Sequence, residues 1–317
     1  FLYFLSSISY SSYGDLKMGS NGFSDYLRPN YVSQNSQGED IIMENPNPKV
    51  QRNTGYNQLN LLQKFLYIPN KYIQFDLGFH FSKTSDIPRY DRLIRDDGQG
   101  GLFYGNWFYG PQEWILINNQ ITLNPKSTSI FDKLKLTTAL QRFSESRNSR
   151  KLYEFNLNTR DEKLNILSLN LDLIKKLNQS SDLTYGLEFI DNKVNSFGTS
   201  TDINDFTTTE IASRYPNNSS LKSFGGYFNY KNKIIDDVFF QSGVRYSFTK
   251  LQADLSHNNI YYDFPFQNTT LENGAFVGGV GLSWVRSTYN NWKFNINTAF
   301  RSPNIDDLAK VFDSEPG

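Results

Sequence analysis

Apolar and polar residues alternate with a period of two in much of this chain. The clearest example is the segment 73–82, IQFDLGFHFS, and the alternation recurs in 167–173, 183–189 and 292–301. Successive side chains of a β-strand point to opposite faces, so each such segment predicts a strand with one apolar and one polar face. A chain built from such strands has to keep its apolar faces out of water.

The alternation identifies eleven candidate strands: 1–17, 56–67, 72–84, 113–122, 134–145, 164–175, 182–195, 222–230, 237–252, 274–287 and 291–300. Every second connection is short, namely 68–71, 124–133, 176–181, 231–236 and 287–290. The others are long: 18–55, 85–112, 146–163, 196–221 and 253–273. The segment 146–163 contains a strand-like piece, LYEFNLN (152–158), which we expect to extend the hairpin above the membrane. Strands joined alternately by short periplasmic turns and long extracellular loops are typical of an antiparallel, all-β transmembrane barrel of the outer membrane.

The composition is compatible with such a barrel and excludes a helical membrane protein. Mean hydropathy is −0.55, and no run approaches the roughly 20 apolar residues of a transmembrane helix. Barrel strands of about 9 to 11 residues are apolar only at every second position, so a low mean hydropathy does not argue against them. Aromatic residues suited to a membrane interface lie beside the short turns: Phe65, Tyr67, Phe228, Tyr230, Trp284 and Trp292.

The chain lacks residues that several other functions need. It contains no Cys, which excludes disulfides, thiolate metal sites and Cys nucleophiles. Lys plus Arg equals Asp plus Glu at 32 each, so no net positive charge points to nucleic acid as a partner. We find no Walker A, HExxH or GxSxG motif and no convincing pair of catalytic carboxylates. We therefore predict neither an enzyme nor a resident metal or cofactor.

The odd strand number predicts that residues 1–317 form only part of a barrel domain. Bacterial single-chain barrels normally have even strand numbers, and an open sheet in lipid would leave two edges of unpaired N–H and C=O groups. We expect about half of a larger barrel. The sequence starts at Phe1 without a signal peptide and ends with FDSEPG after an unpaired strand, so we expect a mature or shortened chain.

Six segments together resemble the TonB-dependent outer-membrane receptors, in the branch common among Bacteroidetes. They are SDIPRYDRL (85–93), GNWFYGPQEW (105–114), LQRFSESRNSRKLYEFNLN (140–158), LTYGLEFIDNKVNSFG (183–198), SRYPNNSSLKSFGGYFNY (213–230) and FRSPNIDDLAKVFDSEPG (300–317). The resemblance implies a barrel of about 22 strands, preceded by a plug domain and by a TonB box that engages the energy-coupling protein. It places the plug and TonB box before Phe1, the last strands after Gly317, and the protein in the outer membrane of a Gram-negative bacterium.

The segment FRSP, residues 300–303, is similar to the Phe-Arg-Ala-Pro box of haem receptors, with Ser302 in place of Ala. In those receptors a His follows the box, whereas residues 304–317 contain none. His and Tyr can ligate haem iron. His80, predicted to face the lumen, and His257, in a loop beside Tyr261, are therefore candidate ligands, with a lining residue and an ordinary loop residue as the alternative readings.

The segment 85–112 combines cations with aromatic rings, including Arg89, Arg92, Trp107 and Tyr109. Guanidinium groups would attract the carboxylates or catecholates of a ferric siderophore, and rings would contact its apolar parts or a porphyrin. A loop that packs on itself through these rings is the alternative. The candidate ligand-binding residues are Arg89, Tyr90, Arg92, Trp107, Tyr109, His257, Tyr261 and Arg301.

The sequence thus predicts an outer-membrane receptor that imports a scarce nutrient with energy from TonB. Its partners would be outer-membrane lipid, the TonB complex and a small-molecule or iron-complex substrate, with siderophore, haem, cobalamin and glycan all left open. The alternatives are a passive porin, an outer-membrane enzyme and a soluble β-sandwich binding module.

Overall fold

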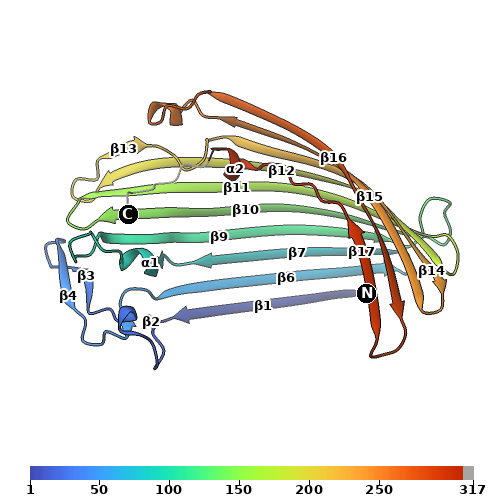
Figure 1. The fold of residues 1–317 in the computed structure, drawn as a ribbon, viewed down its shortest axis with the longest axis horizontal. Coiled ribbons are helices and arrows are strands. Elements are labelled where there is room, and N and C mark those ends of the chain that lie inside the picture. Colours follow the sequence, from blue (N-terminus) through green and yellow to red (C-terminus); the bar gives the residue numbers. More distant parts are fainter. Residues whose placement is uncertain (310–317) are drawn as a thin grey trace.

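The computed structural model describes residues 1–309, and one large antiparallel sheet dominates it (Figure 1). Along the sheet the long strands are β1 (Leu2–Tyr13), β6 (Tyr56–Asn70), β7 (Ile73–Thr84), β9 (Tyr104–Leu123), β10 (Lys133–Lys151), β11 (Asn156–Lys176), β12 (Ser181–Asp202), β14 (Ser219–Ile235), β15 (Val238–Asp254), β16 (Asn268–Val285) and β17 (Asn291–Asn297). Each strand pairs with its neighbour in the chain. The eleven predicted strands are confirmed.

The remaining elements are short. Nine of them lie in the long connections: β2 (Leu16–Lys17), η1 (Ser24–Tyr26), β3 (Asn30–Gln34), β4 (Asp40–Glu44), β5 (Val50–Gln51), β8 (Ile87–Pro88), α1 (Tyr90–Leu93), β13 (Thr208–Ile211) and η2 (Asn258–Ile260). All five predicted short turns lie at one end of the sheet, the short-turn end, and these nine elements gather toward the opposite, long-loop end (Figure 1). The helix α2 (Ile305–Ala309) follows β17 and lies midway along the sheet (Figure 1). No helix within residues 1–309 is long and apolar enough to cross a membrane.

The sheet is a curved wall one layer thick. Within residues 1–309 the buried hydrophobic residues are few: Tyr104, Ala212, Leu251, Ala253, Leu255 and Ile305. A β-sandwich would bury the inner faces of two packed sheets between them, so the fold contradicts the sandwich alternative. Within the described residues β1 and β17 are the two ends of the sheet, which does not close on itself.

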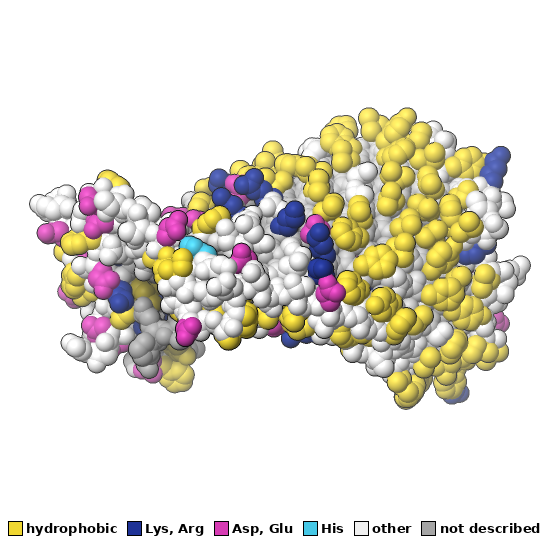
Figure 2. Space-filling model, turned by 90° about the horizontal axis from the view of Figure 1, so that it is seen from above, with side chains coloured by type: hydrophobic (Ala, Val, Ile, Leu, Met, Phe, Trp, Pro, Cys, Tyr) yellow, Lys and Arg dark blue, Asp and Glu magenta, His cyan; other side chains and the backbone are white. Residues whose placement is uncertain are grey.

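Strand register gathers the apolar residues on one face. Phe79, Ile117, Leu140 and Leu167 occupy directly paired positions on β7, β9, β10 and β11, and directly paired residues share a face of a sheet. We call the face that carries them the outer face and their band of apolar side chains the apolar belt. Figure 2 shows hydrophobic side chains gathered over one part of the surface, with charged side chains beyond it.

Several strands continue further than predicted toward the long-loop end. The segment 146–163 forms the expected extension of a hairpin, because β10 runs to Lys151 and β11 begins at Asn156. The extension is longer than predicted, and the first half of the predicted strand-like piece, 152–155, is its turn. Residues 105–112 likewise belong to β9. Above a membrane both faces of a strand meet water, so these extensions carry no regular apolar alternation. Backbone hydrogen bonds and polar side-chain contacts between the strands keep them in the sheet. Strand β1 is shorter than predicted and ends at Tyr13.

Candidate ligand-binding site at the long-loop end

A row of arginine and aromatic side chains crosses the inner face near the long-loop end. Tyr109 on β9 lies opposite Arg147 on β10. Arg89, from the segment before α1, stacks its guanidinium 5.2 Å from the ring centres of both Trp107 and Tyr109. Arg147 stacks on Tyr109 at 5.2 Å as well. One tyrosine ring therefore lies in contact with two cations.

The row continues toward the last part of the chain. Glu145 Oε1 lies 3.7 Å from Arg147 Nη2 and 4.0 Å from Arg214 Nη1. Arg214 stacks on Tyr215 at 5.0 Å, and the Tyr215 hydroxyl donates a hydrogen bond of 2.7 Å to Asp306 in α2. We call Arg89, Tyr109, Arg147, Glu145, Arg214 and Tyr215 the inner-face row.

The ionisable groups of this row keep one charge state at neutral pH. Burial alone would lower the pKa of the Arg89 guanidinium, but its hydrogen bond to Asp91 and its contact with Tyr109 raise that pKa above its ordinary value. Burial and the hydrogen bond to Asp306 raise the pKa of Tyr215, which stays a neutral phenol. The row therefore presents three permanent cations, Arg89, Arg147 and Arg214. Three carboxyl groups lie among them: Asp91 pairs with Arg89, Glu145 lies near both other arginines, and Glu162 lies opposite Glu145 on β11. Burial raises the pKa of Glu162 to about 7.

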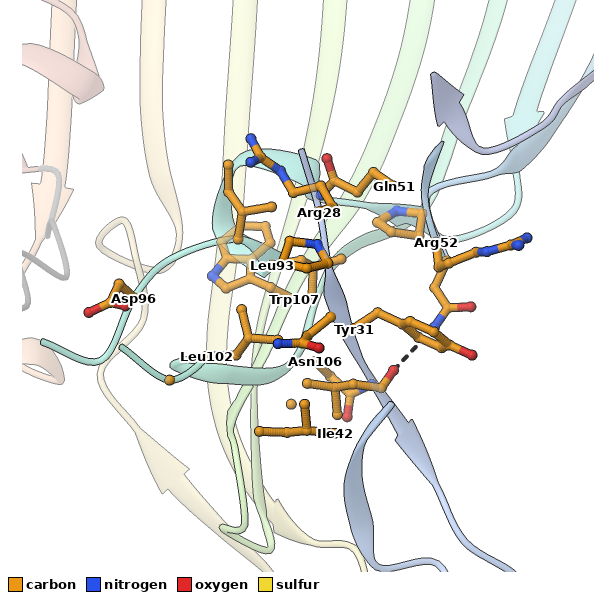
Figure 3. A pocket seen from close by; sticks show the side chains of 18 of the residues that line it. Arg28, Tyr31, Ile42, Gln51, Arg52, Leu93, Asp96, Leu102, Asn106 and Trp107 are labelled. Carbon is orange, nitrogen blue, oxygen red and sulfur yellow. Dashed lines mark hydrogen bonds between the residues drawn. The ribbon is translucent and has the colours of Figure 1, made fainter. Parts of the chain in front are cut away.

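A cavity of about 560 Å³ lies beside the row, between the β3–β4 hairpin, the α1 segment and the start of β9. Figure 3 shows Arg28, Tyr31, Leu93 and Trp107 around it. The lining combines aromatic and aliphatic side chains with guanidinium and amide groups, which is the mixture found in small-molecule sites. Asp86 also lines the cavity, and burial raises the pKa of its carboxyl group.

A buried ion pair fixes one wall of this cavity. Both Arg150 Nη atoms donate 2.7 Å hydrogen bonds to the Asp40 carboxylate, and the two side chains are only 3% and 1% exposed. The Arg150 Nη2 atom also donates to Asn106 Oδ1 at 2.7 Å, and the Tyr153 amide donates to Asp40 at 3.0 Å. This group, the Asp40–Arg150 lock, ties the β3–β4 hairpin to β9 and β10.

The lock makes the hairpin sensitive to acid. Burial alone would raise the pKa of Asp40, but the hydrogen bonds from Arg150 and the Tyr153 amide, with the charge of Arg150, lower it. Its stabilisation is therefore complete above the unfolded pKa of about 3.9 and is lost as pH falls through the folded value. We expect the protection of amide hydrogens in residues 30–44, taken relative to the intrinsic exchange rate at each pH, to fall below about pH 4. Asp40→Asn should exchange fast at pH 7 already, and equal rates in both proteins at pH 7 would contradict the lock.

Three of the predicted ligand-binding residues come together, namely Arg89, Trp107 and Tyr109. The last two lie on strand β9, so their predicted placement in a loop is wrong. Tyr90 and Arg92 lie in α1 beside them. Tyr90 is 54% exposed and its carbonyl accepts a hydrogen bond from Gln51, whereas Arg92 lies 4.0 Å from Asp91.

The other predicted residues lie elsewhere, and within residues 1–309 no hydrogen bond, ion pair or ring contact joins them to Arg89. His257 and Tyr261 flank η2 and form an edge-to-face ring pair at 5.7 Å. Arg301 follows β17 and forms a two-pronged ion pair with Asp307 at 2.7 and 2.6 Å. His80 lies on the inner face and packs on Trp114 at 4.8 Å.

The sequence prediction missed Arg147 and Arg214, together with the Asp40–Arg150 lock. Both residues of the row fall in segments predicted as loops, 146–163 and 196–221. In the segment SESRNSR (144–150), Glu145 and Arg147 are two residues apart, as on one face of a strand, but Arg150 breaks this spacing. A search for apolar alternation does not reveal such a polar strand.

No protein-family profile and no curated protein sequence matches this chain. Solved structures do. The copper transporter OprC matches with a TM-score of 0.65 at 11% identity, over 96% of this chain and 41% of OprC. The FrpB iron transporter from Neisseria meningitidis gives 0.62 at 14% identity, over 96% and 43%. The ferric citrate transporter FecA gives 0.56 at 12% identity, over 91% and 43%.

The chain spans less than half of the length of these three proteins. Their sequence identities are low, so the likeness concerns the fold, and their names give different substrates. They are TonB-dependent receptors of Gram-negative outer membranes. Residues 1–309 therefore have the barrel fold of the TonB-dependent outer-membrane receptors, as the sequence resemblance implies, and correspond to part of such a barrel.

Proposed function

We propose that this chain is part of an outer-membrane receptor that imports an anionic iron complex, such as a ferric siderophore, with energy from TonB. The barrel and its apolar belt support a location in the outer membrane. The plug domain, the TonB box and the strands that would close the barrel belong, in this proposal, to the same protein outside residues 1–317. The barrel binds its substrate and carries out no chemistry on it.

The inner-face row is the observation that carries the proposal. It places three arginines around the rings of Tyr109 and Tyr215. The carboxyl groups of Asp91, Glu145 and Glu162 lie among them. Guanidinium groups donate paired hydrogen bonds to carboxylates and other planar anions, and they remain charged at all physiological pH values. Aromatic rings beside them offer apolar contact to the organic part of a chelator. An anionic, ring-bearing or carboxylate-bearing complex fits this combination.

Replacing Arg147 or Arg214 with Gln tests the proposal. A hydrogen bond to a charged group contributes about 1.5–3 kcal/mol, so each variant should bind ferric citrate or a ferric tris-catecholate roughly 10- to 100-fold more weakly. Binding is measured by quenching of tryptophan fluorescence in the intact purified receptor. The haem alternative is tested in the same assay with haemin and His257→Ala.

Arg286→Gln is the matched control, because Arg286 also stacks on an aromatic ring, Trp284 at 5.4 Å, but lies in a short turn at the other end of the sheet. It should bind like the wild type. Equal affinity of Arg147→Gln and Arg286→Gln for both iron complexes would refute an anion site in the row. Tight binding of haemin that depends on His257 would replace the siderophore with haem.

A further inference from the structure

Glu162 carries a buried carboxyl group that has no partner, beside the inner-face row. It lies on the inner face of β11, directly opposite Glu145 on β10, and is 7% exposed. Both oxygen atoms of its carboxyl group are buried, and within residues 1–309 neither accepts a hydrogen bond or joins an ion pair. A buried carboxylate without a partner is costly, and the protonated acid avoids that cost.

The surroundings of Glu162 are mostly apolar. Glu162 lines a cavity of about 360 Å³ on the inner face. The apolar side chains of this cavity come from four strands and α2: Phe143, Leu164, Ile166, Val194, Leu221 and Ile305. Hydrocarbon cannot solvate a carboxylate, so these side chains favour the neutral acid.

Charged and titratable groups near Glu162 act in opposite directions. They are Glu145 and Arg147 on β10, Arg160, Asp161 and Lys163 on β11, Arg214 and Tyr215 before β14, and Asp306 on α2. The residue of β12 opposite Glu162 is the neutral Ser196. Burial raises the pKa of Glu162 most strongly, and the charges of Arg147 and Arg214 lower it. The result is a pKa of about 7, so the two charge states are similar in free energy at neutral pH.

An anion bound in the inner-face row would change this balance. The proposed function places the anion against Arg147 and Arg214, the same cations that favour the ionised form of Glu162. A bound anion offsets their charge and repels a nearby carboxylate, so it favours the protonated acid. Linkage between two ligands is reciprocal, and protonation of Glu162 must therefore strengthen anion binding by the same factor.

We propose that Glu162 takes up a proton when the inner-face row binds its anion, so that the receptor binds the anion and the proton together. The proton comes from the solvent and is held by one carboxyl oxygen of Glu162. Glu162 thus sets the strength of binding through its charge, and Arg147 and Arg214 make the contacts with the anion. The inference rests on the proposed function, because it requires an anion at these two arginines.

The pH dependence of anion binding tests the proposal. The probe is the ferric complex of a hexadentate tris-catecholate, chosen because its own charge does not change between pH 6 and pH 8. Binding to the intact purified receptor is measured by quenching of tryptophan fluorescence. The dissociation constant of the wild type should rise roughly tenfold from pH 6 to pH 8, because above a pKa of about 7 the anion has to bind with a proton that free Glu162 has released.

Glu162→Gln resembles the neutral acid in size and charge. This variant should bind the probe equally well at pH 6 and pH 8, and at pH 8 it should bind about tenfold more tightly than the wild type. A purely structural role of Glu162 would not produce tighter binding. Titration calorimetry at pH 8 in buffers of different ionisation enthalpy counts the proton directly. The wild type should take up close to one proton per bound anion, and Glu162→Gln should take up none.

Glu113→Gln is the matched control, because Glu113 pairs with Lys83 at 3.2 Å on the outer face, away from the row. It should bind the probe like the wild type at both pH values. Equal affinity of the wild type at pH 6 and pH 8 would overturn the proton coupling, and so would the same pH dependence in Glu162→Gln.

Arg147→Gln distinguishes this inference from the proposed function. Unchanged binding of the probe by Arg147→Gln at both pH values would refute the anion site and the proton coupling together. Weaker binding by Arg147→Gln, combined with a wild type whose affinity does not depend on pH, would refute the coupling alone.

Discussion

Arg150→Met is expected to release the β3–β4 hairpin from the wall of the barrel. The substitution leaves the Asp40 carboxylate, whose side chain is 1% exposed, without its cation. Removing one partner of a buried ion pair typically costs about 3–5 kcal/mol. Amide hydrogen exchange in residues 30–44 should therefore accelerate by roughly two to three orders of magnitude. The cavity beside the hairpin should lose its shape, and any ligand that uses the cavity should bind more weakly.

Lys151→Met provides the control, because Lys151 pairs with Glu154 at 3.7 Å but the two side chains are 45% and 53% exposed. Exposed pairs contribute about 0–1 kcal/mol, so exchange should barely change. The double variant Asp40→Leu, Arg150→Met should recover part of the protection, since two apolar side chains can replace a buried pair. Similar exchange in Arg150→Met and Lys151→Met would show that the lock contributes little.

Gly186→Ala on β12 should impair barrel formation. A Cβ atom at Gly186 would lie 2.2 Å from the Leu171 carbonyl oxygen and 2.8 Å from the Tyr227 ring. Backbone on β11 cannot yield without disturbing its pairing, and Tyr227 is held by a hydrogen bond to Asp172. Overpacking of this kind costs about 1–3 kcal/mol. We expect a lower fraction of folded protein in the outer membrane, measured as the heat-modifiable band in gel electrophoresis.

Gly226→Ala on the adjacent strand β14 is its control. The nearest atom to a Cβ there is Leu187 Cδ2 at 3.5 Å, an ordinary contact. The variant should assemble like the wild type. If both variants assembled equally well, the close approach of strands β11 and β12 at Gly186 would not be required for barrel formation.

The sequence predicts the strands of the large sheet well. Lipid on one side of the sheet and water on the other impose an alternation of apolar and polar residues along each strand. Ile73 to Ser82 carries that pattern, and β7 covers Ile73–Thr84. The pattern ends where the membrane ends. Residues 146–151 and 156–163 are mostly polar on both faces, so the sequence indicates only a short hairpin extension at 152–158, whereas the structure continues both strands.

The site is predictable only where its members are close in sequence. Arg89 and Tyr109 are 20 residues apart, and a local cluster of cations and rings suggests them both. Arg147 and Arg214 reach the same row from β10 and from the segment before β14. Their meeting depends on strand register, which no local pattern encodes. His257 and Arg301 are candidates because their side chains can bind a metal or an anion, and the fold places both of them away from the inner-face row.

Asp40 and Arg150 are separated by 110 residues. The β3–β4 hairpin can therefore make this contact only after β10 has paired with β9, so its docking depends on strands far along the chain. The cavity is completed only when the surrounding strands are in register. A receptor whose strands pair in the wrong register would consequently lack this cavity. Ligand binding in the cavity would therefore depend on correct assembly of the barrel.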